Sequence, residues 1–263
     1  MPDLETSDGT RLHWVETGPP AAPPLVLLHG LGSDSEAFDA LAAAIDDRLH
    51  VVRLDLRGHG RSEPLRDPAR YGWFDRAAAD VLELCDALGW DRPTIAGGSL
   101  GAAVTTAVVL AHPERVSRLV FMAPALGAGP GFENPVAVGF MQGVQALGLV
   151  GLLDQLVSGM PDMLDPVAAA TVRANYSRQD DDAMRACCTA LATAVLVDDL
   201  DRLTAVSQAT LVVGRRGDPL HPFEMAEAYA RRLRDVRLVE DTDATPFDQR
   251  PRDLADLLVG FAD

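Results

Sequence analysis

The order in which strand-like and helix-like segments alternate constrains the fold of this chain more than any other feature. Short apolar runs alternate with segments in which apolar residues recur at helical spacing. Apolar runs without polar alternation are typical of strands buried on both faces of a parallel sheet. After an N-terminal hairpin, the expected strands are 24–30, 50–56, 92–99, 116–126, 209–214 and 236–241. The expected helices are 35–46, 73–89, 100–112, 222–233 and 251–262.

This alternation is interrupted once, between residues 127 and 206. The interrupting segment is rich in Ala, Leu, Met and Gly and has a helical pattern throughout. Repeated strand–helix units predict an α/β fold with a doubly wound, mostly parallel sheet of about eight strands. The interruption predicts a helical insertion, which divides the chain into a first core part at 1–126, the insertion at 127–206, and a second core part at 207–263.

Charge and composition narrow the range of partners. The formal net charge is −16, and all 23 cationic side chains are arginines, a usage typical of high-GC genomes such as actinobacterial ones. Such acidity without a basic run argues against nucleic acid or an anionic membrane surface as a partner. The longest apolar stretch, VAVGFMQGVQALGLVGLL, is interrupted by Gln and Gly, so it predicts a packed helix rather than a membrane span.

Cysteine usage and the N-terminus favour a cytoplasmic protein. The three cysteines form neither a disulfide framework nor a metal-binding spacing; they are Cys85, Cys187 and Cys188. The N-terminal MPDLETSDGT is acidic and polar, unlike a secretory signal. Because the sequence has no phosphate-binding loop or dinucleotide fingerprint, we expect neither a metal nor an organic cofactor.

The segment GGSLG at 97–101 predicts a nucleophilic serine. It matches G-x-S-x-G and lies between an expected strand and an expected helix. Small residues beside Ser99 suit a tight turn that lifts its hydroxyl to the carboxyl end of the sheet. There the N-terminus of the following helix favours developing negative charge.

A second loop, HGLG at 29–32, is expected to complete an oxyanion hole. The backbone N–H groups of Leu31 and of Leu100, which follows the serine, could face one developing oxyanion. For His29 we expect a structural role of its imidazole, because the donors required here are backbone groups.

Together these motifs resemble the α/β-hydrolase fold superfamily over nearly the whole chain. The resemblance implies that Ser99 is the nucleophile, that Asp218 is the triad acid, and that 127–206 is a cap over the active site. It also implies that the loop containing His59 is scaffold. The supporting segments are HGLG (29–32), DLRGHGRS (55–62), GGSLG (97–101), AHPERVSRLVFMAP (111–124) and GRRGDPLHP (214–222).

The resemblance fails at the catalytic histidine. Members of the superfamily carry that histidine after the last strand in a GHxPxxxxP setting, whereas this chain reads TDATPFDQRP. Counting back from Pro246 puts Asp243 at the glycine position and Ala244 at the histidine position. An alanine cannot accept a proton, so the triad predicted here is incomplete.

Two nearby residues are candidate substitute bases. His221 is the only histidine near the expected site, three residues beyond Asp218. The favoured interpretation is that it merely precedes the helix beginning at Pro222. Asp243 could act as a base if a second carboxylate raised its pKa, but an aspartate also tolerates the turn geometry that glycine would otherwise supply.

Four interpretations of Ala244 remain open. It could be an engineered replacement in an ordinary serine hydrolase, which the neighbouring Asp243 argues against. The chain could be a hydrolase with a rerouted base, a non-hydrolytic cyclase or lyase using the same pocket, or a ligand-binding protein. The leading prediction is acyl-ester chemistry through Ser99 despite the incomplete triad.

The expected substrate follows from the insertion. Its Met- and Leu-rich composition, with Phe140 and Met141 among the candidate lining residues, predicts an apolar and adaptable cavity. We therefore expect the partner to be a hydrophobic small molecule, namely an ester, lactone or thioester.

Overall fold

One eight-stranded sheet forms the centre of the fold. The structure, a computed structural model, describes residues 3–125, 134–159, 166–241 and 251–262. The strand order is β1-β2-β4-β3-β5-β6-β7-β8, with β2 antiparallel to both β1 and β4 and all other pairs parallel. The doubly wound, mostly parallel sheet predicted from the alternation is therefore confirmed. The strands are β1 (Asp3–Glu5), β2 (Arg11–Thr17), β3 (Pro24–Leu28), β4 (His50–Leu54), β5 (Thr94–Gly98), β6 (Arg118–Met122), β7 (Ala209–Arg215) and β8 (Val236–Asp241).

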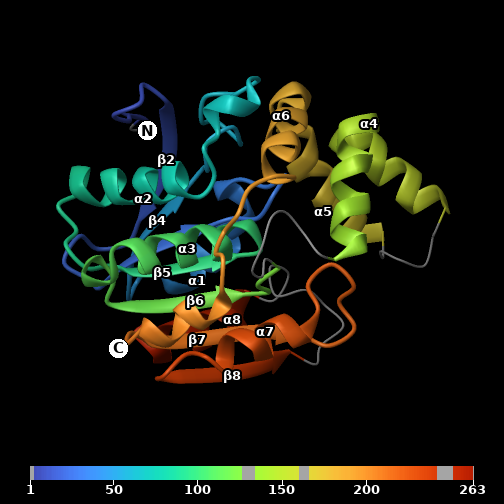
Figure 1. Cartoon of the computed structure of the whole chain (residues 1–263). Coiled ribbons are helices and arrows are strands. Elements are labelled where there is room, and N and C mark those ends of the chain that lie inside the picture. Colours follow the sequence, from blue (N-terminus) through green and yellow to red (C-terminus); the bar gives the residue numbers. More distant parts are fainter. Residues whose placement is uncertain (1–2, 126–133, 160–165, 242–250, 263) are drawn as a thin grey trace.

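Helices cover both faces of this sheet (Figure 1). One face packs on α2 (Asp75–Ala87), α3 (Leu100–Ala111) and α7 (Phe223–Ala230), and the other on α1 (Asp39–Ile45) and α8 (Pro251–Ala262). Alternate residues of one strand enter opposite cores: Val26 and Leu28 face α2 and α3, while Leu25 and Leu27 face α1. This explains why β3 is apolar along its whole length. Short 3₁₀ turns are η1 (Ser35–Phe38), η2 (Pro68–Arg70), η3 (Pro113–Arg115) and η4 (Leu200–Ala205).

Between β6 and β7 the chain forms three further helices at one end of the sheet, here called the α4–α6 segment (Figure 1). They are α4 (Pro135–Gly159), α5 (Pro166–Ser177) and α6 (Asp181–Leu191). They fall within the predicted insertion at 127–206, although residues 126–133 and 160–165 lie outside the described part of the chain. The exact division into core and insertion remains a prediction.

Helix α4 is the one helix in the described part of the chain that is long and apolar enough to cross a membrane. It is broken at Gly148, whose φ of +72° is unfavourable for residues with a side chain. A Cβ at this position would also lie 2.7 Å from the carboxylate oxygens of Asp181. Met141, Val144 and Leu149 of α4 are buried in the same core as α2 and α3. In this structure α4 thus packs one face on the core, while other apolar side chains of the helix, such as Val136 and Leu147, are exposed.

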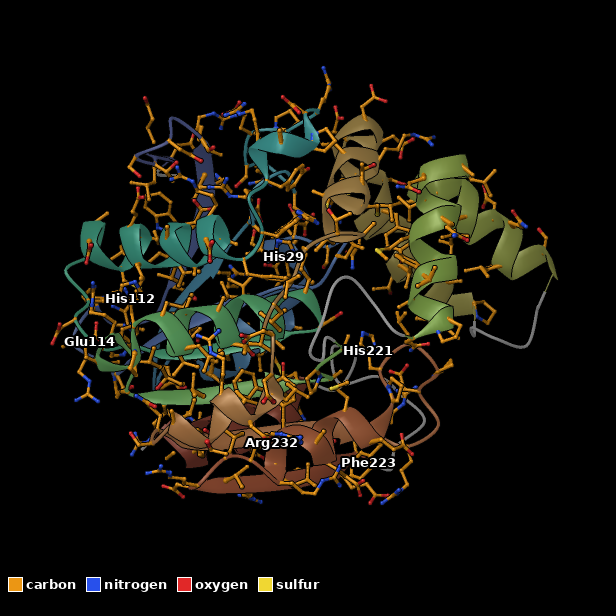
Figure 2. All side chains as sticks on the ribbon, viewed as in Figure 1. His29, His112, Glu114, His221, Phe223 and Arg232 are labelled. Carbon is orange, nitrogen blue, oxygen red and sulfur yellow. The ribbon has the colours of Figure 1, made fainter. Side chains whose placement is uncertain are left out.

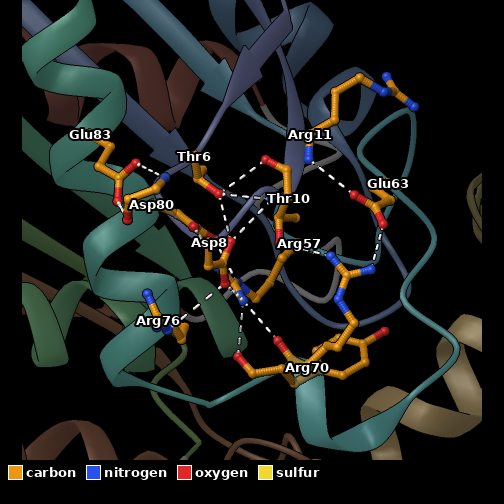
Figure 3. Close-up of polar contacts among 12 residues, drawn as sticks. Thr6, Asp8, Thr10, Arg11, Arg57, Glu63, Arg70, Arg76, Asp80 and Glu83 are labelled. Carbon is orange, nitrogen blue, oxygen red and sulfur yellow. Dashed lines mark hydrogen bonds and ion pairs between the residues drawn. The ribbon is translucent and has the colours of Figure 1, made fainter.

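A buried ion-pair network fixes the loop that follows β4 (Figure 3). The Arg57 guanidinium donates from Nε and Nη2 to the two carboxylate oxygens of Asp80 on α2, at 2.7 and 2.6 Å. Its Nη1 donates to Asp8 of the N-terminal hairpin at 3.2 Å and to the Arg70 carbonyl at 2.9 Å. Because Arg57 is only 1 % exposed, these partners are what make its charge tolerable in the interior.

Candidate active site

Ser99 lies on a strained turn between β5 and α3. Its φ of 51° and ψ of −111° are unusual for a residue with a side chain. The glycines on either side allow this turn. A Cβ on Gly97 would lie 2.1 Å from the Gly101 carbonyl oxygen, and one on Gly101 would lie 2.1 Å from the Leu28 carbonyl oxygen. Only glycine fits at both positions. Because these glycines let the backbone segments approach closely, the chain can turn sharply at Ser99, directly after β5.

The loop after β3 packs directly against this serine. A Cβ on Gly30 would lie 3.3 Å from Ser99 Cβ and 3.8 Å from its Oγ. Leu31 and Leu100, the predicted oxyanion-hole residues, line one cavity together with Ser99. Leu100 is the first residue of α3, so its N–H has no acceptor within the helix. Both residues thus lie beside the hydroxyl.

His221 reaches Ser99 from the loop after β7. The distance from its Nε2 to Ser99 Oγ is 2.9 Å, and that from its Nδ1 to Asp218 Oδ2 is 3.0 Å. Figure 2 shows His221 beside the end of the sheet that faces the α4–α6 segment. The three side chains therefore form a continuous hydrogen-bonded chain from carboxylate to imidazole to hydroxyl.

The turn that carries this pair is built from its own residues. Asp218 Oδ1 accepts hydrogen bonds from the backbone N–H groups of Leu220 and His221, at 2.9 and 3.0 Å. Gly217 precedes it with a φ of +76°, which favours glycine. From outside, Asn134 Nδ2 donates to the carbonyls of Pro219 and Leu220 at 2.8 and 3.1 Å. The carboxylate, imidazole and backbone are thus held as one unit.

The protonation states follow from these contacts. Burial alone would raise the pKa of Asp218, but the hydrogen bond and charge of His221 hold that pKa below its ordinary value. Asp218 is therefore ionised at neutral pH. A carboxylate can only accept, so its bond to His221 fixes the hydrogen of the neutral ring on Nδ1. The Nε2 lone pair then faces the Ser99 hydroxyl.

This geometry does not fit the interpretation favoured from the sequence for His221. In the loop it does precede Pro222 and α7, as expected, but it also lies within hydrogen-bonding distance of both Ser99 and Asp218. Asp243 and Ala244 lie outside the described residues. The sequence signal available for the contact was the spacing Asp-x-x-His, which lets the two side chains of one turn meet.

Two further histidines lie buried nearby and have other partners. The Nδ1 of His29 donates to the Gly30 carbonyl at 2.8 Å, and its Nε2 accepts from the Leu56 N–H at 2.9 Å. His59 Nδ1 donates to the Arg57 carbonyl at 3.1 Å. Burial lowers the pKa of His29, and burial together with the neighbouring His29 lowers the pKa of His59 to about 3. Both rings are neutral, and both ring nitrogens of His29 are occupied.

Two apolar cavities meet at the serine. The larger, about 320 Å³, is lined by residues that include Phe38, Met122 and Val213. The smaller, about 170 Å³, is lined by residues that include Phe140 and Met141 of α4. Both cavities take part of their wall from the α4–α6 segment, as expected for Phe140 and Met141. Three leucines of α4 are buried in the core instead; they are Leu149, Leu152 and Leu153.

The described residues contain no group of three or more His, Cys, Asp or Glu side chains that could hold a metal ion. The cysteines are all buried and form no disulfide with one another; they are Cys85, Cys187 and Cys188. Burial raises the pKa of the thiols of Cys85 and Cys188 to about 12, so neither is a nucleophile at neutral pH.

A family model described as alpha/beta hydrolase fold matches residues 23–192. Among curated proteins, the pimeloyl-[acyl-carrier protein] methyl ester esterase of Aromatoleum aromaticum is 30% identical over 263 aligned positions. That alignment covers 90% of this chain and 96% of the relative.

Two solved structures superpose on this chain over 99% of its length. The enol-lactonase from Burkholderia xenovorans LB400 superposes with a TM-score of 0.83 at 25% identity, covering 99% of each chain. Est816, described as an N-acyl homoserine lactone degrading enzyme, superposes with a TM-score of 0.78 at 26% identity, covering 99% of this chain and 100% of that one. The chain therefore belongs to the alpha/beta hydrolase fold family.

Proposed function

We propose that this protein is a serine hydrolase that cleaves apolar esters or lactones through Ser99, with His221 as the base and Asp218 as its partner. The observation that carries this proposal is the pair of distances, 2.9 Å from Ser99 Oγ to Nε2 and 3.0 Å from Nδ1 to Asp218 Oδ2. Acid and base would then come from one turn, three residues apart. The alanine at position 244 would follow from this arrangement, since no histidine is needed there.

In the first half of the reaction, Ser99 Oγ attacks the carbonyl carbon while His221 Nε2 takes the hydroxyl proton. The negative charge moves to the carbonyl oxygen, where the N–H groups of Leu31 and Leu100 would stabilise it. The intermediate then collapses, and the imidazolium gives its proton to the leaving alkoxide. An acyl-enzyme and a free alcohol result from an ester, whereas from a lactone the new hydroxyl stays attached to the acyl group.

In the second half, the same groups act on water. His221 Nε2 takes a proton from a water molecule that attacks the acyl carbon. It then returns this proton to Ser99 Oγ as the carboxylic acid leaves. Asp218 stays ionised throughout and stabilises the imidazolium. Its lowered pKa suits that role, because a protonated carboxyl is neutral and could not offset the positive charge of the imidazolium.

The comparisons support this reaction class. The relatives and structural neighbours described above are named as an ester esterase and as lactone-cleaving enzymes. The apolar lining of both cavities favours a hydrophobic substrate. We further propose that the α4–α6 segment acts as the cap of this site, since α4 and α5 both contribute to the cavity walls.

Steady-state hydrolysis of short p-nitrophenyl esters tests the assignment. We expect Ser99→Ala and His221→Ala to lower kcat by about 10⁴-fold or more. His112→Ala is the matched control, because His112 lies at the far end of α3 (Figure 2) and should leave turnover unchanged. Unchanged turnover in His221→Ala, together with loss of turnover in Asp243→Asn, would instead assign the base to Asp243.

A further inference from the structure

Among the residues that the structure describes, the two cavities at the reaction centre share four lining residues: Gly30, Ser99, Tyr176 and His221. Three of these belong to the proposed reaction centre or its supporting loop. Tyr176 is different, because it comes from α5 and is the only shared lining residue from the described part of the α4–α6 segment. The point at which the two cavities meet is thus bounded by the reacting groups on the core side and by one aromatic ring on the other.

Tyr176 is packed closely against the oxyanion loop. A Cβ on Gly32 would lie 3.1 Å from Tyr176 Cε1 and 3.1 Å from the methyl carbons of Leu149. Gly32 therefore leaves just enough room for the ring. Burial raises the pKa of Tyr176 to about 12, so its hydroxyl is neutral and is no candidate for the base.

The residues that follow Tyr176 fasten the end of α5 to the core. Arg178 donates from Nε and Nη2 to the two carboxylate oxygens of Asp34, at 2.6 and 2.8 Å. The same Nη2 donates to Asn175 Oδ1 at 2.7 Å. The side chain of Gln179 accepts from the Gly60 N–H at 2.9 Å. These bonds lie within three residues of Tyr176, so they hold the end of α5 that carries it against the core.

The cavities on either side differ in size, and the walls of both are mainly apolar. The larger, of about 320 Å³, extends over the ends of the strands to Met122, Val213 and Leu254. The smaller, of about 170 Å³, lies under α4 and includes Leu191 and Leu220. The carbonyl carbon of an ester carries an acyl chain on one side and an alkoxy group on the other. Each of these two groups could occupy one of the two unequal apolar cavities.

We propose that the substrate is an ester with two apolar groups of unequal length, one in each cavity, and that Tyr176 is the specificity-determining wall between them. The inference rests on the proposed function, because it assumes attack by Ser99. In the native protein, one side of the ester should accept a long chain. The other side should accept only a short one.

Two matched ester series test this arrangement. One varies the acyl chain from two to ten carbons on a methyl alcohol, and the other varies the alcohol over the same range on an acetyl group. Each methylene that fits should raise kcat/KM by about fourfold, and the first that does not fit should lower it by about 10-fold or more. We expect kcat/KM to begin to fall at a short chain length in one series (the early limit) and only at a long chain length in the other (the late limit).

Replacing Tyr176 with alanine should join the two cavities. In Tyr176→Ala the early limit should move by several carbons, while the late limit of the other series stays in place. Tyr176→Phe is the control: it keeps the ring and should keep both limits. The inference is overturned if Tyr176→Ala leaves both limits in place or lowers kcat equally on every ester.

A Ser99-directed label separates this inference from the proposed function. If a fluorophosphonate labels Ser99 and His221→Ala abolishes hydrolysis, the chemistry stands and only the chain-length limits decide the role of Tyr176. If the native protein neither hydrolyses any ester nor labels at Ser99, the proposed function fails. The substrate inference then fails with it.

Discussion

Asn134 should control the position of His221 without touching the reacting atoms. Its Nδ2 donates to two carbonyls of the 218–221 turn, at 2.8 and 3.1 Å, and its Oδ1 accepts from the Val136 N–H at 2.9 Å. Removing three hydrogen bonds of this kind by Asn134→Ala should lower the free energy of unfolding by about 1–3 kcal/mol. The turn would then be free to shift, and a displacement of about 1 Å costs up to about 10²-fold in rate.

The assay is steady-state hydrolysis combined with urea denaturation. We expect kcat to fall by about 10–10²-fold in Asn134→Ala while KM changes little, because the apolar cavities are not altered. Asn134→Asp keeps the acceptor for Val136 but loses both donors, so it should show most of the loss in kcat. Asp67→Ala is the matched control, since Asp67 caps η2 through the Ala69 N–H. An unchanged kcat in Asn134→Ala, with a stability loss like that of Asp67→Ala, would refute the reasoning.

Three further predictions concern the loops around the site. Asp80→Ala leaves the Arg57 charge buried without its bidentate partner, so urea denaturation should show a loss of about 3–5 kcal/mol at an unchanged m-value. Burial alone would raise the pKa of Asp34, but the hydrogen bonds and charge of Arg178 hold that pKa below its ordinary value. The Asp34–Arg178 ion pair therefore stabilises the fold at pH values above the ordinary pKa of an aspartate, and this stabilisation is lost as the pH falls and Asp34 is protonated. The difference in Tm between the native protein and Asp34→Asn should therefore shrink as the pH falls below about 4, and a constant difference would contradict this. Ala244→His should not raise kcat on activated esters if His221 already serves as the base; a large increase would show that the native base is inadequate.

The fold could be predicted from the sequence because its signals are local. Buried strands and amphipathic helices are recorded in the spacing of apolar residues, and the observed elements lie within a few residues of the expected ranges. Ser99 could be singled out for the same reason, because the glycines at 97 and 101 are needed by the turn itself. Phe140 and Met141 likewise followed from the composition of the insertion.

The contact between His221 and Ser99 could not be predicted in this way. Ser99 and His221 are 122 residues apart, and their meeting depends on β5 and β7 ending at the same edge of the sheet and on the exact course of one turn. The roles of Asn134 and Tyr176 were also not recognised, since neither belongs to a motif. Their positions come from tertiary contacts with the 218–221 turn and with Gly32. Comparing the sequence with a family motif instead directed attention to Ala244.

The most direct test of the central claim is the rate at which a fluorophosphonate labels Ser99, followed by intact mass and peptide mapping. The reaction needs the serine proton to be removed but needs neither a substrate nor turnover. Rapid labelling of the native protein, lowered by about 10²–10⁴-fold in both His221→Ala and His221→Gln, is the result expected if His221 is the base. Equal labelling rates in the native protein and the two variants would contradict the account.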